Sequence, residues 1–191
     1  MTPRYLAGVA YASELHHGHV RKGSGVPYLS HLLSVSALVL ENGGDEDQAI
    51  AGLLHDGPED CGGEPVLVEI ERRFGPRVAA IVQACTDTVL EPKPPWRDRK
   101  EEYLAGVPAK PTDALVVILS DKLHNARSIV RDHEQLGSAL WSRFRGGRDG
   151  TAWYYRALLV SLAARPDAHR SLVAELTSVV DDLVGRAEAD A

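Results

Sequence analysis

The residues of this chain best suited to chemistry are two histidines and two aspartates of the kind that bind a divalent metal ion. His31, the adjacent pair His55 and Asp56, and Asp121 are separated by segments that read as helices. Two imidazole nitrogens and two carboxylates fit Mn²⁺, Fe²⁺ or Zn²⁺ and leave coordination positions open, which favours catalysis over structural support. Among the other histidines, we expect His124 to support these ligands. The alternatives are an ordinary buried or capping histidine at 31 and an ion-paired surface aspartate at 121.

Two more carboxylates follow the His-Asp pair almost directly. Glu59 and Asp60 are placed to hold and deprotonate a water molecule, as a general base must for attack on phosphorus. Pro58 would clash with a carbonyl in a continuous helix, so we expect the preceding helix to end near Asp56, with Gly57 absorbing the bend. The acidic pair is therefore expected on a turn, and the alternative interpretation is a merely solvated acidic turn.

Residues suited to a phosphorylated ligand lie on both sides of this set. Arg21, Lys22 and Ser24 belong to a glycine-containing loop, in which cations can bind phosphate oxygens and an arginine can stack on a purine. Asn125 and Ser128 follow the last metal-ligand candidate at i+4 and i+7, which places them in its stripe of a helix. Together these residues indicate a nucleotide clamp beside the metal site.

Apolar residues recur along the chain at helical rather than alternating spacing, which predicts an all-α fold. Turn signals, the last of them Arg165-Pro166-Asp167, separate about eight to ten helices. The expected helices cover residues 3–18, 28–42, 45–56, 64–74, 76–88, 97–106, 112–132, 135–144, 149–164 and 168–187. The basic, proline-rich residues 91–111 form either a solvated connector or a mobile flap over an anionic ligand.

Length and composition are those of an ordinary globular protein. With 191 residues, of which 44% are apolar and 25% charged, we expect one domain over residues 1–191. The net charge of −6 argues against a general nucleic-acid binder. Two cysteines without a CxxC pair are typical of a reduced intracellular protein, and no apolar run is as long as a membrane span. We therefore expect a cytoplasmic location and no membrane partner.

Four stretches of sequence carry a resemblance to a known family. They are HVRKGSGVPYLSH at residues 19–31, LLHDGPED at 53–60, FGPRV at 74–78 and DKLHNAR at 121–127. In this order they resemble the HD-domain hydrolases of the RelA/SpoT and metazoan SpoT-homologue group, over roughly residues 5–132. In that family an all-helical, Mn²⁺-dependent domain removes the 3′-pyrophosphate from (p)ppGpp, which yields GDP or GTP and pyrophosphate.

The resemblance implies a role for each candidate residue. It implies one Mn²⁺ ion with four ligands, His31, His55, Asp56 and Asp121. It implies a water-activating pair, Glu59 and Asp60. It implies contacts to the nucleotide from Arg21, Lys22, Ser24, Asn125 and Ser128, of which the first stacks on the base. We add Lys122 and Arg127 as alternatives for holding the phosphorus. The resemblance also indicates a small stand-alone hydrolase, with a catalytic core at about 5–132 and the helices of residues 135–187 packed on it.

The chain departs from the family pattern at a few places. Leu32 follows His31 where the family usually has proline, and Gly57-Pro58 replaces the usual apolar pair before the acidic residues. The aromatic residues of 141–156 are expected to pack in the core, with closure of the pocket as the alternative. Two other functions stay open: an HD phosphatase acting on NADPH, (p)ppApp or another nucleotide, and a catalytically weak HD module that binds nucleotide. A homo-oligomer is also left open.

Overall fold

The structure, a computed structural model, describes residues 1–88, 90, 92–165 and 167–191. Two features of the sequence analysis therefore reach outside the described residues. The basic segment of residues 91–111 begins with Glu91, and the last turn signal contains Pro166.

The described residues form ten α-helices and two 3₁₀ helices, and the only β contact among them is an isolated bridge between Val20 and Pro27. The α-helices are α1 (Pro3–Leu15), α2 (Leu29–Glu41), α3 (Glu46–Leu54), α4 (Gly57–Cys61), α5 (Glu64–Phe74), α6 (Pro76–Cys85), α7 (Trp96–Gly106), α8 (Thr112–Leu136), α9 (Gly147–Ala163) and α10 (Arg170–Ala189). The 3₁₀ helices are η1 (Val107–Ala109) and η2 (Gly137–Arg143). The predicted all-α fold is confirmed.

The short helix α4 was not expected. The preceding helix ends at Leu54, near the predicted place, but Glu59 and Asp60 lie in α4 rather than on a turn, and this prediction was wrong. Pro58 lies in the first turn of the new helix, where its missing N–H costs nothing because the first turn needs no intrahelical hydrogen bond from its N–H groups.

A second difference concerns the end of the longest helix. α8 continues to Leu136, and most of the expected helix at residues 135–144 is the 3₁₀ helix η2. Gly137 has a φ of 56°, a backbone conformation that glycine adopts without steric cost and that ends the α-helix there.

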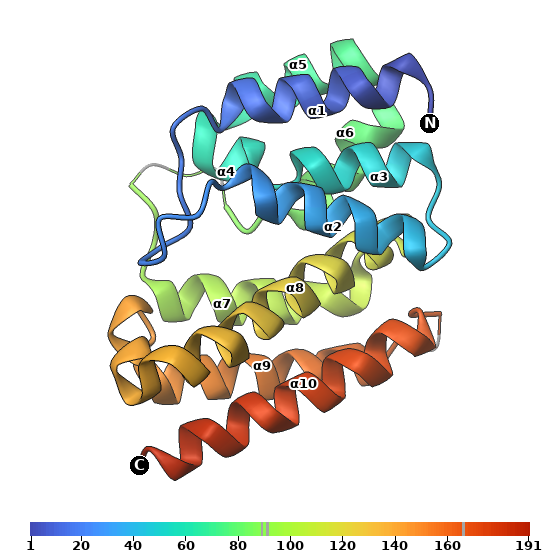
Figure 1. Ribbon diagram of the computed structural model, residues 1–191. Coiled ribbons are helices and arrows are strands. Elements are labelled where there is room, and N and C mark those ends of the chain that lie inside the picture. Colours follow the sequence, from blue (N-terminus) through green and yellow to red (C-terminus); the bar gives the residue numbers. More distant parts are fainter. Residues whose placement is uncertain (89, 91, 166) are drawn as a thin grey trace.

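Helix α8 crosses the middle of the molecule (Figure 1). It contacts α2, α3 and α6 on one side and α10 on the other, while α1 packs on α2 and α3. The C-terminal helices α9 and α10 pack against each other, and α7 contacts α9. None of the described helices combines the length and apolarity that crossing a membrane requires.

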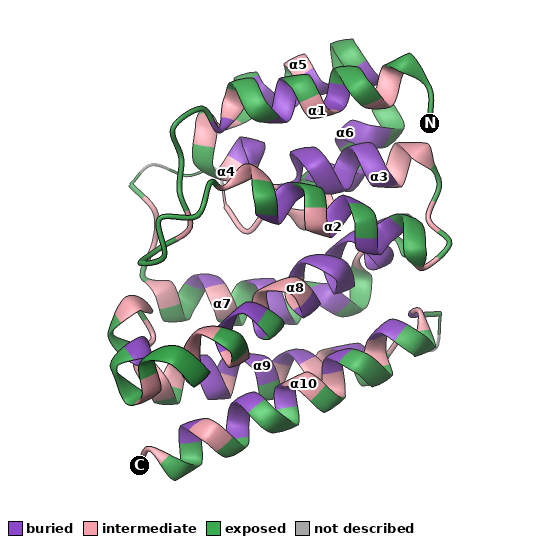
Figure 2. Cartoon of the chain, viewed as in Figure 1, coloured by how far each residue is buried: buried purple, intermediate pink, exposed green. Residues whose placement is uncertain are grey.

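The buried apolar side chains form one cluster to which α1, α10 and the helices between them contribute. All residues from 49 to 54 in α3 and all from 114 to 121 in α8 are buried. Figure 2 shows this contrast, since α3 is mostly buried while α10 alternates between buried and exposed positions. The two buried stretches place the C-terminal part of α3 and the N-terminal half of α8 at the centre of the fold.

A glycine allows α2 and α3 to approach closely. A Cβ atom at Gly52 would lie 3.2 Å from the Cα and 3.4 Å from the backbone N of Ser36 on α2. The Ser36 hydroxyl also donates to the carbonyl of Ala49 at 2.9 Å. This close contact fixes the N-terminal turn of α2, which carries His31, against the C-terminal end of α3, which is followed by His55.

Replacing Gly52 by valine should therefore destabilise the fold. We expect the Gly52→Val variant to lose about 1–3 kcal/mol of unfolding free energy, as overpacked core sites do. The matched control is Gly185→Val on α10, where an added Cβ would meet no described atom within 4 Å. The control should change stability by less than about 0.5 kcal/mol. Urea denaturation followed by circular dichroism measures both, and equal effects would refute the close-packing argument.

Candidate functional site

The four residues proposed from sequence as metal ligands converge at the centre of the fold. His31 Nε2 lies 3.3 Å from Asp121 Oδ1 and 3.5 Å from Asp56 Oδ2. His55 Nε2 lies 3.1 Å from Asp56 Oδ2 and 3.5 Å from Asp121 Oδ1. The donor atoms of His31, His55 and Asp56 are all within 4.8 Å of one another. Helices α2 and α8 and the residues between α3 and α4 thus bring two nitrogens and two carboxylates to one point.

The other nitrogen of each imidazole is held by a hydrogen bond. His55 Nδ1 lies 2.9 Å from the carbonyl of Gly52, to which it donates. His31 Nδ1 lies 2.8 Å from His124 Nδ1. Burial and the neighbouring His31 lower the pKa of His124 to about 3, so His124 is neutral and can accept the proton of His31 Nδ1. His124 therefore lies next to the ligand candidate His31, as expected from the sequence.

The inward-facing nitrogens have the features of metal ligands. His31 Nε2 and His55 Nε2 are buried and have no hydrogen-bond partner among the described residues. Buried polar atoms without a partner are rare and call for an explanation such as an ion. A divalent cation between the two nitrogens and the carboxylates of Asp56 and Asp121 would satisfy both. The donor set therefore fits a divalent metal.

The charges of this cluster stabilise one another. Burial alone would raise the pKa of Asp121, but the adjacent Lys122 ammonium and the two histidines hold that pKa well below its usual value. Lys122 Nζ donates to Asp121 Oδ2 at 2.7 Å. The pKa of His55 is raised well above its usual value, because Asp56 and Asp121 outweigh the effect of burial. A cation entering the cluster must therefore displace a proton from His55.

A tyrosine outside the proposed ligand set orients Asp56. The Tyr28 hydroxyl donates to Asp56 Oδ2 at 2.7 Å. Burial and the nearby carboxylates raise the pKa of Tyr28, so it keeps its proton. Tyr28 belongs to the family-like stretch of residues 19–31, but no role was predicted for it from sequence.

The acidic pair on α4 faces cations from the segment around α7. Lys93 Nζ lies 3.3 Å from Glu59 Oε1 and 3.5 Å from Asp60 Oδ1. Arg99 Nη1 lies 3.6 Å from the same Glu59 oxygen, and the Arg99 side chain is buried. Burial raises the pKa of Glu59, and the Lys93 ammonium opposes this rise. The described part of residues 91–111 is therefore packed against the site rather than a fully solvated connector.

The arginine of the glycine-containing loop is tied to the metal cluster through an amide. Arg21 Nη2 donates to Asn125 Oδ1 at 2.8 Å, and Asn125 Nδ2 donates to Asp121 Oδ1 at 2.5 Å. Arg21 also lies over the Tyr28 ring, with 5.8 Å from its guanidinium carbon to the ring centre. Asn125 of the predicted stripe thus faces the cluster, while Ser128, whose hydroxyl donates to the His124 carbonyl, lines the adjoining cavity.

The remaining ligand-contact candidates divide into two groups. Lys22, Lys122, Asn125 and Ser128 line one cavity together with Arg21. Ser24 instead lines a neighbouring cavity of about 600 Å³ that shares Arg21 and Ser128.

Arg127 does not reach the cluster, and its assignment as a ligand contact is corrected here. Its guanidinium forms an ion pair with Glu175 of α10, and its side chain is exposed. It follows Asp121 by six positions, which is roughly 240° around a helix, so the two side chains point to different faces.

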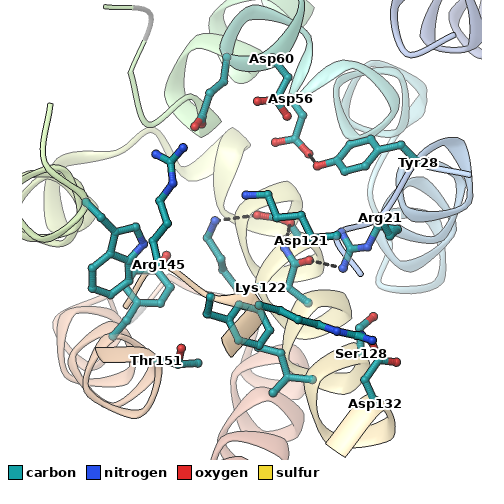
Figure 3. Close-up of a pocket in the computed structure, with 18 of the residues that line it drawn as sticks. Arg21, Tyr28, Asp56, Asp60, Asp121, Lys122, Ser128, Asp132, Arg145 and Thr151 are labelled. Atoms are coloured by element: carbon teal, nitrogen blue, oxygen red, sulfur yellow. Dashed lines mark hydrogen bonds and ion pairs between the residues drawn. The ribbon is translucent and has the colours of Figure 1, made fainter. Parts of the chain in front are cut away.

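The main cavity has a volume of about 950 Å³, at the upper end of what small-ligand sites occupy. Nine lysine and arginine side chains line it, against five aspartates and glutamates. Figure 3 shows the carboxylates of Asp56, Asp60 and Asp121 and the cations of Lys122 and Arg145 pointing into the same space. This excess of positive charge favours an anionic ligand next to the metal cluster.

The far wall of the cavity combines tyrosines, for which the sequence analysis left closure of the pocket as an alternative, with arginines that had no predicted role. Arg143 and Arg145 come from η2 and the turn after it, and Tyr154 and Tyr155 come from α9. The tyrosines are buried and also belong to the apolar cluster, so packing and closure of the pocket are combined in them. No motif marks the two arginines, and only their proximity to these aromatic residues in the sequence could have drawn attention to them.

Comparison with known proteins gives the family. The HD domain family matches residues 8–152. The chain is 33% identical over 129 residues to the mouse guanosine-3′,5′-bis(diphosphate) 3′-pyrophosphohydrolase MESH1, an alignment that covers 66% of this chain and 69% of the mouse protein. The Xenopus tropicalis MESH1 is 36% identical over the same share of each chain.

A solved structure supports the fold. It is that of a metazoan SpoT orthologue described as hydrolysing ppGpp, and it superposes with a TM-score of 0.77 at 23% identity, covering 94% of both chains. The resemblance inferred from the sequence motifs is confirmed. The chain belongs to the HD domain family, and its relatives in that family include the MESH1 pyrophosphohydrolases.

Proposed function

We propose that this protein hydrolyses (p)ppGpp, removing the 3′-pyrophosphate to give GDP or GTP and pyrophosphate. The observation that carries the proposal is one cavity that is lined by Asp56 and Asp121 of the His/Asp cluster and by the Glu59 and Asp60 pair, and whose lining holds more cations than anions. The names and the identity of the MESH1 relatives support the choice of substrate. A phosphohydrolase needs this combination, whereas a binding module has no need of the acidic pair.

The proposed metal is one Mn²⁺ ion held by the four converging side chains. Two imidazoles with two carboxylates form a borderline donor set, better suited to Mn²⁺, Fe²⁺ or Zn²⁺ than to Mg²⁺. When bound, such a cation supplies Lewis acidity toward a phosphoryl oxygen and lowers the pKa of a coordinated water. The Tyr28 hydroxyl and the His124 ring keep the ligands Asp56 and His31 in their orientations.

The proposed general base is Glu59, with Asp60 beside it. An ionised Glu59 accepts a proton from water as the water oxygen bonds to the phosphorus attached to the 3′ oxygen. The bond between that phosphorus and the 3′ oxygen breaks, the 3′ oxygen takes up a proton from solvent, and pyrophosphate leaves. Lys93 and Arg99 position the Glu59 carboxylate, since both cations approach its Oε1 atom.

The cations of the cavity are proposed to hold the nucleotide. Arg21 stacks on the base in an orientation that its hydrogen bond to Asn125 fixes. Lys22 and Lys122 neutralise phosphate oxygens, and Ser128 contacts the sugar. Ser24 lies on the adjoining cavity and contacts the far end of the ligand.

The extent and the location of the protein are part of the same proposal. We treat residues 1–191 as one domain, because the apolar cluster includes residues from α1 to α10. The two free cysteines support a reducing compartment such as the cytoplasm.

The first test is turnover of ppGpp with Mn²⁺. Wild-type protein should release pyrophosphate and GDP in equal amounts. Glu59→Gln should lower kcat about 100-fold or more, because general bases contribute about 10²–10⁴-fold. Asp121→Asn should lose turnover and Mn²⁺ binding together. The matched control Glu64→Gln, at an exposed position on α5, should retain full activity.

Two competing substrates make this assay decisive. Turnover of NADPH or ppApp without turnover of ppGpp would assign a different phosphohydrolase. If the metal-loaded protein hydrolyses none of the three but binds them in equilibrium dialysis, the chain is a binding module and the proposed function is wrong.

Removal of the metal gives a second prediction. Protein stripped with a chelator should be inactive, and Mn²⁺ should restore activity at lower concentration than Mg²⁺ because two ligands are imidazoles. His55→Gln should raise the Mn²⁺ concentration needed for half-maximal activity. Metal-independent turnover by the stripped protein would contradict the proposal.

The pH dependence of kcat tests the base. Glu59 acts only when ionised, so activity is lost as the pH falls through its raised pKa. Lys93→Gln removes a cation that lowers this pKa, so its acidic limb should shift to higher pH. Arg97→Gln, a change on α7 at a residue that pairs with Glu101, should leave the limb in place. An unchanged limb in Lys93→Gln would show that Glu59 is not the titrating base.

A further inference from the structure

A second group of metal-binding side chains lies outside the His/Asp cluster. His16, His19 and Cys61 each offer a donor atom, and these atoms all lie within 4.8 Å of one another. The Nδ1 atoms of the two histidines are 3.3 Å apart. Cys61 Sγ lies 3.7 Å from both ring nitrogens of His16. None of the functions argued above uses these residues.

Local structure explains why they meet. His16 caps the C-terminal end of α1, and Gly18, with a φ of 74°, turns the chain so that His19 N donates to the His16 carbonyl. Cys61 is the last residue of α4, and its thiol donates to the carbonyl of Leu15 at 3.3 Å. Helix α4, which carries Glu59 and Asp60, therefore also places the Cys61 sulfur beside the turn after α1.

We propose that His16, His19 and Cys61 form a second metal site, for Zn²⁺ or a similar borderline-soft cation. A tetrahedral Zn²⁺ ion, with bonds of about 2.0–2.1 Å to nitrogen and about 2.3 Å to sulfur, separates its ligands by about 3.3–3.4 Å for two nitrogens and about 3.6 Å for nitrogen and sulfur. The separations of 3.3 Å between the two Nδ1 atoms and 3.7 Å between Cys61 Sγ and His16 are close to these values, and the donor atoms of His19 and Cys61 lie within 4.8 Å of each other. A water molecule completes the coordination.

The surroundings suit such an ion. His16 is buried, and burial lowers its pKa, so its ring is neutral and free to ligate. His19 is exposed and lines the main cavity, which gives an ion a way in. Burial raises the pKa of Cys61 to about 11, so the thiol is protonated until a cation arrives. Binding thus releases one proton from the thiol to solvent, and affinity should rise with pH.

The Tyr28 ring lies between the proposed second site and the His31, His55, Asp56 and Asp121 cluster. The His16 ring stacks on Tyr28, with the ring centres 5.0 Å apart and the planes at 20°, and the Tyr28 hydroxyl donates to Asp56. The two sites are nevertheless chemically distinct, because the first contains no sulfur.

Cobalt distinguishes them. Co²⁺ bound by a thiolate absorbs in the near ultraviolet through charge transfer from sulfur, whereas Co²⁺ held by imidazoles and carboxylates lacks this band. With the first site filled, titration of the purified full chain should develop the band over one further equivalent of Co²⁺, and Zn²⁺ should displace it. Cys61→Ser should abolish the band. His19→Gln should weaken cobalt affinity at this site by at least about tenfold, the lower limit for residues that merely support a ligand.

The control is the other cysteine, at the end of α6. Cys85→Ser should keep the full band, because Cys85 belongs to no such group among the described residues. Urea midpoints of all variants check that each is folded, and slower alkylation of Cys61 by iodoacetamide in the presence of Zn²⁺ gives an independent measurement. No band when the first site is filled, or a band that persists in Cys61→Ser, would overturn the proposal.

Discussion

The buried carboxylate of Asp121 is the interaction on which the rest of the site depends. Its Oδ1 atom faces both histidine nitrogens and accepts from Asn125, while Oδ2 accepts from Lys122. A buried charge is costly unless it is paired, and removing one partner leaves the others unpaired in a medium of low polarity. The apolar stretch of α8 before Asp121 places this carboxylate at the centre of the fold. Any change that disturbs the packing of this stretch should therefore also disturb the site.

The carboxylates of the site fall into two groups with different surroundings and different pKa shifts. Asp56 and Asp121 are kept ionised by histidines and Lys122, and they suit cation binding. Glu59 has a raised pKa in a partly buried position on α4, and it suits proton transfer. Pairs of acids whose surroundings drive their pKa values apart are a recurrent basis for assigning different roles to chemically similar groups. Asp56 immediately precedes α4 and Glu59 lies within it. The Gly57-Pro58 step that begins α4 therefore places these two carboxylates in different surroundings.

The sequence predicted the helices well because their apolar faces have a clear period, and it predicted the convergence of the four ligand candidates because they belong to ordered motifs. It missed α4, since Pro58 was read as the end of a helix and not as the start of another. Arg127 could have been placed correctly from helical geometry alone. The positions of Arg143 and Arg145 could not, and pocket closure by Tyr154 and Tyr155 stayed only an alternative, because this wall depends on how α9 packs against α7 and η2.

Arg21 lies in a loop with two glycines at positive φ, Gly23 and Gly25, yet its guanidinium is already bonded to Asn125. A long side chain that must be ordered by its ligand costs binding about 0.5–1.5 kcal/mol in conformational entropy. For Arg21 most of that ordering occurs during folding. The loop can therefore remain adaptable along its backbone while the Arg21 guanidinium is preorganised, so that association should lose less entropy than the glycine content of the loop alone would suggest.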